Sequence, residues 1–355
     1  MIFNTELFVG ANLMTGDEDV LPIGNSEINE GILSTARSVV RTCLQIRKEE
    51  DVLVITDPMT SRIGKALYEE AARVTERILM VMIPPSQRAG KEPPSPVSDI
   101  MRRNRVIIIA TQNSLTHTRA RMNASKEGAR IVSMPGIVDN LFENGGMTAD
   151  YNALQREIGG MSSIFRRKRD VHVTTSAGTD IKFRTGGRWI LEDNGICNRP
   201  GQVSNLPAGR VFVLPEEGSM IGQIVIDGSW EGSILEEPII FQVEEGLVSG
   251  IEGGNLASQI NEIFEVAKTS QRGSKRDLVP TVAEFGFGLN PKAIKIVGNR
   301  LEDQVVRGSA YFGFGDNSAL GGKSRVGFHL RGVMMNPSLT LDDVSLLVEG
   351  KVTIP

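Results

Sequence analysis

The chain has 355 residues, a length that favours two domains, and 40% of them are hydrophobic, which is enough for real cores. A net charge of −4 and an aromatic content of 5% argue against a general nucleic-acid surface. No apolar run reaches the roughly 18 to 20 residues of a membrane span. The acidic start of the chain does not resemble a signal peptide, and Cys43 and Cys197 lack the CxxC spacing of a zinc site. We therefore expect a cytoplasmic protein that binds neither membranes nor nucleic acid.

The first part of the chain alternates helical and strand patterns. Apolar residues recur at helical spacing over residues 30–48, and a short β-branched run follows at 51–57. Residues 61–75 predict an amphipathic helix, and residues 76–85 predict a second buried strand that two prolines end. The alternation continues with a helix at 97–104, a strand at 105–111, a helix at 116–128 and a strand at 129–135. This order predicts a parallel sheet wrapped by helices, and thus a Rossmann-like α/β domain over residues 1–165.

This domain lacks the usual nucleotide-binding motifs. No GxGxxG follows the first strand, so the layout does not imply a dinucleotide. The stretch "DPMTSRIGKAL" lacks the GK[ST] ending of a Walker loop. Lys65 is therefore interpreted as a residue on the surface of a helix.

The pattern changes near residue 170. Residues 170–186 alternate and turn like a hairpin, and short glycine-rich strands continue to the end of the chain. Two helices interrupt them, near residues 256–271 and 292–303. Residues 166–355 therefore predict a β-rich α+β domain. The dense glycines suit tight hairpins and a backbone that lines a pocket.

Three segments of the second domain concentrate the polar residues that could carry chemistry: residues 205–228, 282–293 and 310–332. Each is a strand flanked by glycine or proline, with a polar residue where an apolar one would be usual. Glu284 has an apolar setting, so its carboxylate must be exposed, paired or bound to a ligand. His329 is followed two residues later by Arg331, where a metal site would need a carboxylate.

The other polar features of the sequence favour structural roles. The basic run 166–169 is interpreted as a solvated linker face, with a phosphate or partner contact as the alternative. His117 is expected to be a helix cap or interdomain contact, and His172 a surface or cross-strand residue. Glu216 and Glu217 are expected in a solvated loop, with the rim of a pocket as the alternative. Asp316 and Asn317 are interpreted as turn formers first and as neighbours of the site second.

The ordered motifs resemble one known family. "VTTSAGTDIKF", "NLPAG", "GQIVIDGS", "AEFGFGLNPKA", "GSAYFGFGDNSALGGK" and "FHLRGV" occur in order, and the resemblance runs from about residue 50 to the end. They are similar to the thermophilic aminopeptidase family, the group of aminopeptidase T that also includes 2,5-dihydroxypyridine 5,6-dioxygenase. The resemblance implies the same two-domain fold, with a C-terminal domain of aminopeptidase T type, and a homodimer.

The resemblance also implies five metal-ligand positions, which here are Arg210, Glu284, Tyr311, His329 and Arg331. Glu284 and His329 keep the ligand type. A two-metal peptidase site would place its cations beside guanidinium groups. The single-iron dioxygenase site maps to Glu284, His329 and Arg331, and would need Tyr311, Asp316 or another residue to complete it.

Several functions stay open on this sequence. The favoured one is an enzyme like aminopeptidase T or the dihydroxypyridine dioxygenase, with a remodelled, metal-poor site that acts on a small anionic or heteroaromatic compound. It would use Glu284, Tyr311 and His329 in catalysis, and Arg210, Arg331 and Asp316 would contact the substrate. The alternatives are a metal-dependent aminopeptidase and a noncatalytic homologue in which Arg331 pairs with Glu284. The cofactor is either one divalent metal, iron or zinc, held by Glu284 and His329, or none.

Overall fold

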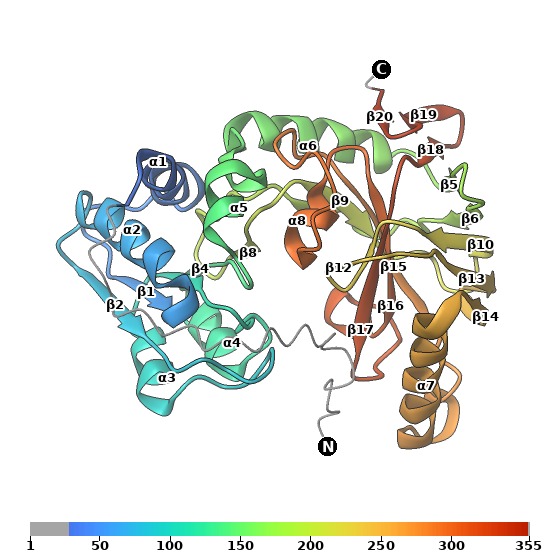
Figure 1. Ribbon diagram of the computed structural model, residues 1–355, viewed down its shortest axis with the longest axis horizontal. Coiled ribbons are helices and arrows are strands. Elements are labelled where there is room, and N and C mark those ends of the chain that lie inside the picture. Colours follow the sequence, from blue (N-terminus) through green and yellow to red (C-terminus); the bar gives the residue numbers. More distant parts are fainter. Residues whose placement is uncertain (1–27, 354–355) are drawn as a thin grey trace. The chain divides into compact units, whose positions relative to one another are not determined.

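The computed structural model describes residues 28–353 (Figure 1). Its internal contacts divide the chain into two compact units. The first comprises the chain up to residue 143 together with residues 197–203, and the second comprises residues 144–196 and 204–355. The helix α6 (Tyr151–Phe165) thus belongs to the second unit, although the sequence analysis extends the first domain to residue 165. The reason is visible at its last residue, since Phe165 stacks on Phe287 with ring centroids 6.0 Å apart.

The first unit is built on a five-stranded sheet with the order β2-β1-β3-β4-β8, and the β2-β1-β3-β4 neighbours are parallel. Helices alternate with these strands, which confirms the predicted Rossmann-like layout (Figure 1). Its elements are α1 (Glu30–Ser38), the π-helical turn η2 (Val39–Cys43), β1 (Val52–Thr56), η3 (Pro58–Thr60), α2 (Ser61–Ala72), β2 (Ile78–Met82), α3 (Ser95–Met101), β3 (Val106–Ala110), α4 (Arg119–Lys126), β4 (Arg130–Ser133), α5 (Asp139–Asn144) and β8 (Val203–Asn205).

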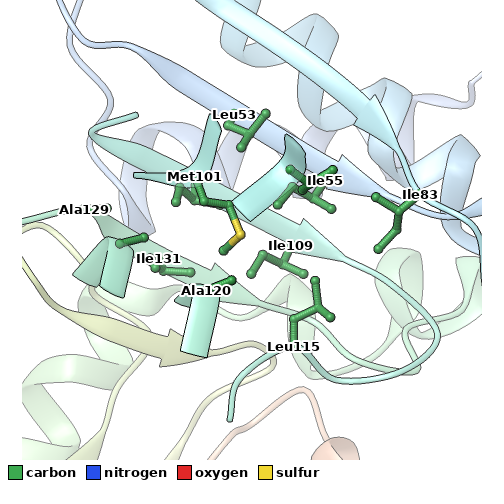
Figure 2. Close-up of a cluster of buried hydrophobic side chains, with 12 residues drawn as sticks. Leu53, Ile55, Ile83, Met101, Ile109, Leu115, Ala120, Ala129 and Ile131 are labelled. Carbon is green, nitrogen blue, oxygen red and sulfur yellow. The ribbon is translucent and has the colours of Figure 1, made fainter. Parts of the chain in front are cut away.

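The core of this unit lies against the central strands. β1 and β3 are buried along their whole length, as expected for parallel strands covered on both faces. Figure 2 shows one side of this core, where Leu53, Ile55 and Ile109 pack with Met101 and Ile131. Burial of apolar side chains stabilises the fold by about 25 cal/mol for each Å² removed from water.

The strand β2 differs from its prediction. It was predicted to be buried, but Leu79, Met80 and Met82 are exposed. Among the described strands, β2 lies at the edge of the sheet and pairs with β1, and its Val81 packs against the core cluster. An apolar run indicates a strand, but it does not indicate whether the strand is central or at an edge.

The segment after β1 has a structural role. Asp57 caps the turn η3 by accepting hydrogen bonds from the backbone N–H groups of Met59 and Thr60, at 3.1 and 3.2 Å. Gly64 lies directly against Thr56, where an added Cβ would approach to 2.8 Å. Lys65 is exposed on α2, as predicted.

The second unit contains two antiparallel sheets and three α-helices among the described residues. One sheet has eight strands in the order β14-β13-β10-β6-β5-β18-β19-β20, and the other has seven in the order β12-β11-β17-β16-β15-β9-β7. The strands are β5 (Asp170–Thr174), β6 (Asp180–Arg184), β7 (Leu191–Asp193), β9 (Arg210–Val213), β10 (Ile221–Ile226), β11 (Ser229–Trp230), β12 (Ser233–Ile234), β13 (Ile239–Glu244), β14 (Leu247–Glu252), β15 (Val282–Gly288), β16 (Ala310–Gly315), β17 (His329–Met334), β18 (Ser338–Leu341), β19 (Val344–Val348) and β20 (Lys351–Val352).

The helices of this unit are α6, α7 (Gly254–Ser270) and α8 (Arg300–Val305), with single 3₁₀ turns at Gly146–Thr148, Gly273–Lys275 and Ser318–Leu320. The predicted hairpin at β5 and β6 and the predicted helix α7 are confirmed. The second predicted helix is shorter than expected, because α8 begins only at residue 300. Asn299 caps it by accepting from the N–H groups of Leu301 and Glu302, and the preceding residues include Pro291 and Gly298. Among the described helices, none is long and apolar enough to cross a membrane.

The seven-stranded sheet has two different faces. The repeated pattern Phe-Gly-Phe-Gly in β15 and β16 places the phenylalanines on one face and the glycines on the other, since side chains alternate along a strand. The phenylalanine face packs against the eight-stranded sheet. The ring centroids of Phe241 and Phe314 are 4.4 Å apart, and those of Phe183 and Phe285 are 5.3 Å apart. The opposite face is left to glycine and polar side chains.

Candidate functional site

The strand register brings the predicted site residues of β15, β16 and β17 to this polar face. Gly313 of β16 lies opposite Glu284 of β15 and opposite Arg331 of β17. Gly315 lies opposite His329. Residues directly opposite each other in an antiparallel pair share a face, so Glu284, His329 and Arg331 project together.

The same face of the sheet also carries Tyr311 of β16 and continues onto the next two strands, β9 and β7. Tyr311 lies opposite Gly286, and Arg210 of β9 lies opposite Gly288. Asp193 of β7 lies opposite Arg210 at the edge of the sheet. The structure therefore collects Arg210 and Tyr311 on the side that carries Glu284, as the sequence motifs predict.

The glycines of this face have no room for a side chain. A Cβ added at Gly313 would lie 2.6 Å from Cγ of Glu284 and 2.8 Å from Nε2 of His329. A Cβ added at Gly286 would lie 2.5 Å from the hydroxyl oxygen of Tyr311. The polar side chains thus lie flat over bare backbone, which is the physical reason for the glycine-rich motifs.

Glu284 is the centre of the cluster, and its side chain is 0% exposed. Nε of Arg331 donates a hydrogen bond to Oε1 of Glu284, and Nε2 of His329 lies 3.3 Å from the same oxygen without hydrogen-bond geometry. Burial alone would raise the pKa of Glu284, but the charges of Arg331 and His329 outweigh it and hold the pKa well below its usual range. Glu284 is therefore a carboxylate, and its second oxygen has no hydrogen-bond partner among the described residues.

His329 is oriented by the main chain of Asp316. Nδ1 of His329 lies 2.7 Å from the carbonyl oxygen of Asp316. A carbonyl only accepts, so Nδ1 carries the hydrogen and Nε2 is the nitrogen that exchanges a proton. The Asp316 carboxylate itself accepts from Ser318 and Gly327 in its own loop. Asp316, which the sequence suggested as a substrate contact, reaches the site through its backbone.

The guanidinium of Arg210 is bound by other residues of the cluster. Its Nε donates to Oδ2 of Asp193 at 2.9 Å, and its Nη1 donates to Oε1 of Gln304. Its guanidinium carbon lies 5.5 Å from the centre of the Tyr311 ring, a cation–π distance. Tyr311 is fully buried, and burial raises the pKa of its hydroxyl, so the phenol stays protonated. That hydroxyl has no hydrogen-bond partner within the described chain.

Besides Asp193 and Gln304, two further residues of the cluster were not singled out in the sequence. Oε1 of Glu231 accepts a hydrogen bond from the backbone N–H of Arg331 at 2.6 Å. Oε2 of Glu231 lies 3.0 Å from Nη2 of Arg300, the first residue of α8. The sequence signal was weak, since Glu231 is one half of an ordinary Glu-Gly turn and Arg300 looks like a residue of a longer surface helix.

The charges of the cluster are paired one to one. Arg210 pairs with Asp193, Arg331 with Glu284 and Arg300 with Glu231. These three pairs sum to zero, so any charge on His329 is additional. Guanidinium groups supply the positive charge that a metal ion would supply in the site that the motif resemblance implies.

The residues do not fit a divalent metal. Iron or zinc needs several imidazole or carboxylate ligands that converge on one point. Here Oε1 of Glu284 faces a guanidinium, and the position two residues after His329 is Arg331 instead of a carboxylate. Within residues 28–353, no group of three or more His, Cys, Asp or Glu side chains is placed to hold a metal ion. The donor set therefore disagrees with the metal site that the motif resemblance implies.

The remaining residues that the sequence singled out have other partners. His172 lies 2.7 Å from Asp180 on the neighbouring strand, which confirms the cross-strand prediction. Glu216 pairs with Arg184 at 3.1 Å. In the basic run, Arg166 pairs with Glu192 at 2.5 Å. Glu217 pairs with Arg188, and Lys168 of the basic run pairs with Asp343. His117 is exposed and directly precedes Thr118, the N-cap residue of α4.

The fold defines an α/β protein whose parallel-sheet unit is joined to a two-sheet unit of the aminopeptidase T type. Wild-type AmpT from Thermus thermophilus matches with a TM-score of 0.66 and 13% identity, over 91% of this chain and 99% of that one. The 2,5-dihydroxypyridine dioxygenase of Pseudomonas putida KT2440 matches with a TM-score of 0.75 and 20% identity, over 91% of this chain and 97% of that one. At these identities the similarity establishes the fold.

The family follows from the sequence. A family model described as 2,5-dihydroxypyridine 5,6-dioxygenase matches residues 32–354, so the chain belongs to the 2,5-dihydroxypyridine 5,6-dioxygenase family. The Pseudomonas putida enzyme of that name is 25% identical over 216 residues, which are 57% of this chain. The aligned part spans 59% of the length of that curated relative. The resemblance inferred from the ordered motifs is confirmed.

Proposed function

We propose that the protein is an enzyme that binds a small anionic, ring-sized compound at this cluster and moves a proton on it without a divalent metal. The observation that carries the proposal is the contact between Arg331 and Glu284. In this contact the guanidinium of Arg331 binds the Glu284 carboxylate that a metal ion would need as a ligand. Beside it lies His329, whose Nε2 can exchange a proton because Nδ1 is bound to a carbonyl oxygen. The name of the Pseudomonas putida relative supports a pyridine-sized ring as the ligand.

The residues supply the parts of an acid–base mechanism. Nε2 of His329 takes up or releases the proton, while the carbonyl of Asp316 holds the ring in place through Nδ1. The Glu284 carboxylate, 3.3 Å from Nε2, stabilises the imidazolium that forms. Arg331 faces the negative charge that develops on the substrate, as the donors of an oxyanion hole do. Tyr311 keeps its proton and serves as a neutral donor.

Metal content and ligand charge test the proposal together. We would measure iron and zinc in the purified protein and titrate it with nicotinate and with nicotinamide, a matched pair in which only the former is an anion. The proposal expects far less than one divalent ion per chain and a preference for nicotinate. Arg331→Gln should weaken nicotinate binding by about 1.5 to 3 kcal/mol, the range for a charged hydrogen bond, and leave nicotinamide unchanged. Arg184→Gln removes an arginine of an exposed ion pair with Glu216 outside the cluster and serves as the control.

A noncatalytic role is the second candidate, and the same pairing favours it. Each arginine of the cluster already has a carboxylate, and Glu284 and Tyr311 are sealed from solvent. Buried ion pairs can often be replaced by apolar residues without loss of stability. Equal binding of nicotinate and nicotinamide, together with a fully stable Glu284→Leu/Arg331→Met variant, would support this candidate over the enzyme. The cytoplasmic homodimer expected from the sequence remains a prediction.

A further inference from the structure

The most accessible cation of the cluster is the arginine that sequence motifs did not mark. The Arg300 side chain is 44% exposed, compared with 23% for Arg331 and 8% for Arg210. Arg210 is held by Asp193 and Gln304, and Nε of Arg331 faces Glu284. Arg300 therefore has the guanidinium that an incoming anion meets first.

Arg300 also keeps donors for a ligand. A guanidinium carries five N–H donors in a planar fork. The polar contacts of the Arg300 side chain within the described chain both involve Nη2, which lies 3.0 Å from Oε2 of Glu231 and 3.4 Å from the carbonyl oxygen of His329. The other edge of the fork can grip a carboxylate through two parallel hydrogen bonds.

Glu231 links this arginine to Arg331. Its Oε2 pairs with Arg300, while its Oε1 accepts the backbone N–H of Arg331 at 2.6 Å and its own N–H donates to the Arg331 carbonyl at 3.0 Å. The adjacent Gly232 lies against the start of α8, where an added Cβ would be 2.9 Å from the backbone nitrogen of Arg300. The carboxylate thus lies between two guanidinium-bearing residues that would otherwise repel each other.

The hairpin turn that contains Glu231 does not require its carboxylate to face the cluster. Glu231-Gly232 is a two-residue hairpin loop in which both residues have positive φ, 51° and 85°. The same Glu-Gly loop with positive φ occurs at residues 245–246 and 349–350, and there the glutamate is exposed. Local turn geometry therefore does not explain why Glu231 is directed to Arg300 and Arg331.

We propose that Arg300 is the specificity-determining residue that selects an anionic substrate, and that Glu231 is a positioning residue that holds Arg300 beside Arg331. This inference rests on the proposed function, because it takes the same cluster as the binding site. An anion between the two guanidinium groups relieves their mutual repulsion, so binding energy depends on their spacing. Positive charge alone does not give two parallel hydrogen bonds to a carboxylate, because these also require the correct spacing of Arg300 and Arg331.

The experiment measures the preference for nicotinate over nicotinamide in the full-length protein by titration calorimetry. Arg300→Gln should lower the affinity for nicotinate about tenfold, equivalent to about 1.4 kcal/mol, without changing that for nicotinamide. Arg300→Lys should recover only part of the loss, because an ammonium cannot form the planar fork. Glu231→Gln should reduce the same preference, whereas Glu245→Gln, the same change in the matched exposed turn, should not.

Each outcome bears on the inference. If nicotinate preference persists in Arg300→Gln and disappears in Arg331→Gln, the assignment of Arg300 is overturned while the proposed function stands. If the wild-type protein prefers neither probe, both are overturned. If Glu231→Gln does not fold, Glu231→Asn replaces it, since asparagine suits a left-handed turn position but is too short to reach Arg300. An unchanged preference in the folded Glu231 variant would contradict its positioning role.

Discussion

Arg331 donates a hydrogen bond from Nε to Oε1 of Glu284, the same carboxylate oxygen that lies 3.3 Å from Nε2 of His329. One buried oxygen therefore meets two positively chargeable groups. This relationship explains the lowered pKa of Glu284 and the poor fit to a divalent metal.

The pairing predicts an asymmetry between single and double variants. Glu284→Gln leaves Arg331 without its counter-charge and should lower the free energy of unfolding by about 1 to 3 kcal/mol. The loss is smaller than for a fully buried pair because the Arg331 side chain is partly exposed. Glu284→Leu/Arg331→Met removes both charges and should lose less. Urea denaturation of both proteins measures the difference. If the double variant were less stable than Glu284→Gln, the ion pair would stabilise the fold more than apolar side chains do at these two positions, against this prediction.

Glu302 predicts a pH dependence of stability. Burial raises its pKa to about 7, the N–H of Gly146 opposes this, and Asp303 adds to it. Because the pKa is about 4.3 in the unfolded chain, the folded state holds the proton more tightly, and this stabilisation is present in acid and lost as pH rises through 7. Glu302→Gln should therefore melt higher than the wild type at pH 8.5 and nearly equally at pH 4, below the pKa of the unfolded carboxyl. Glu262→Gln, at an exposed helix position, should show no such dependence. A constant difference at both pH values would count against the titration of Glu302.

The close approach at Gly313 predicts a steric effect. Gly313→Ala would put a methyl group 2.6 Å from Cγ of Glu284 and 2.8 Å from Nε2 of His329, so both side chains must move. Such overpacking typically costs about 1 to 3 kcal/mol. Gly159→Ala on α6 has open space around it and should instead stabilise by roughly 0.5 to 1 kcal/mol, as alanine does in a helix. Equal thermal stability of the two variants would contradict the packing described for this face.

Replacing the guanidinium predicts a gain of metal binding. Arg331→Asp places a carboxylate two residues after His329 and beside Glu284, which completes a set of one imidazole and two carboxylates. Titration with zinc should give one binding event per chain in this variant and none in the wild type. Equal zinc binding by both proteins would mean that Arg331 does not block a metal site.

Much of the site could be predicted because the ordered motifs resemble one family, and that resemblance marks Arg210, Glu284, Tyr311, His329 and Arg331. The structure adds the reason why they lie together, which is the alternation of side chains along the strands. The spacing of Glu284 in β15 and Tyr311 in β16 follows from the repeated Phe-Gly pattern, and His329 and Arg331 follow from one strand of period two. These local patterns also indicated the strands and helices of both units.

The parts that escaped prediction depend on long-range pairing. Glu231 reaches Arg331 because β11 pairs with β17, about a hundred residues away in sequence, and Asp193 reaches Arg210 because β7 pairs with β9. The exposed β2 also depends on sheet order, which an apolar run does not encode. A single sequence carries no signal for these partners, because any of several strands could be adjacent.

The most direct test of the account is the preference of the wild-type protein for nicotinate over nicotinamide, measured before and after exhaustive treatment with EDTA. Because guanidinium groups carry the positive charge of the site, we predict a preference for nicotinate of the same size in both samples. A preference that disappears with EDTA and returns on addition of iron or zinc would contradict the account and assign the anion site to a metal ion.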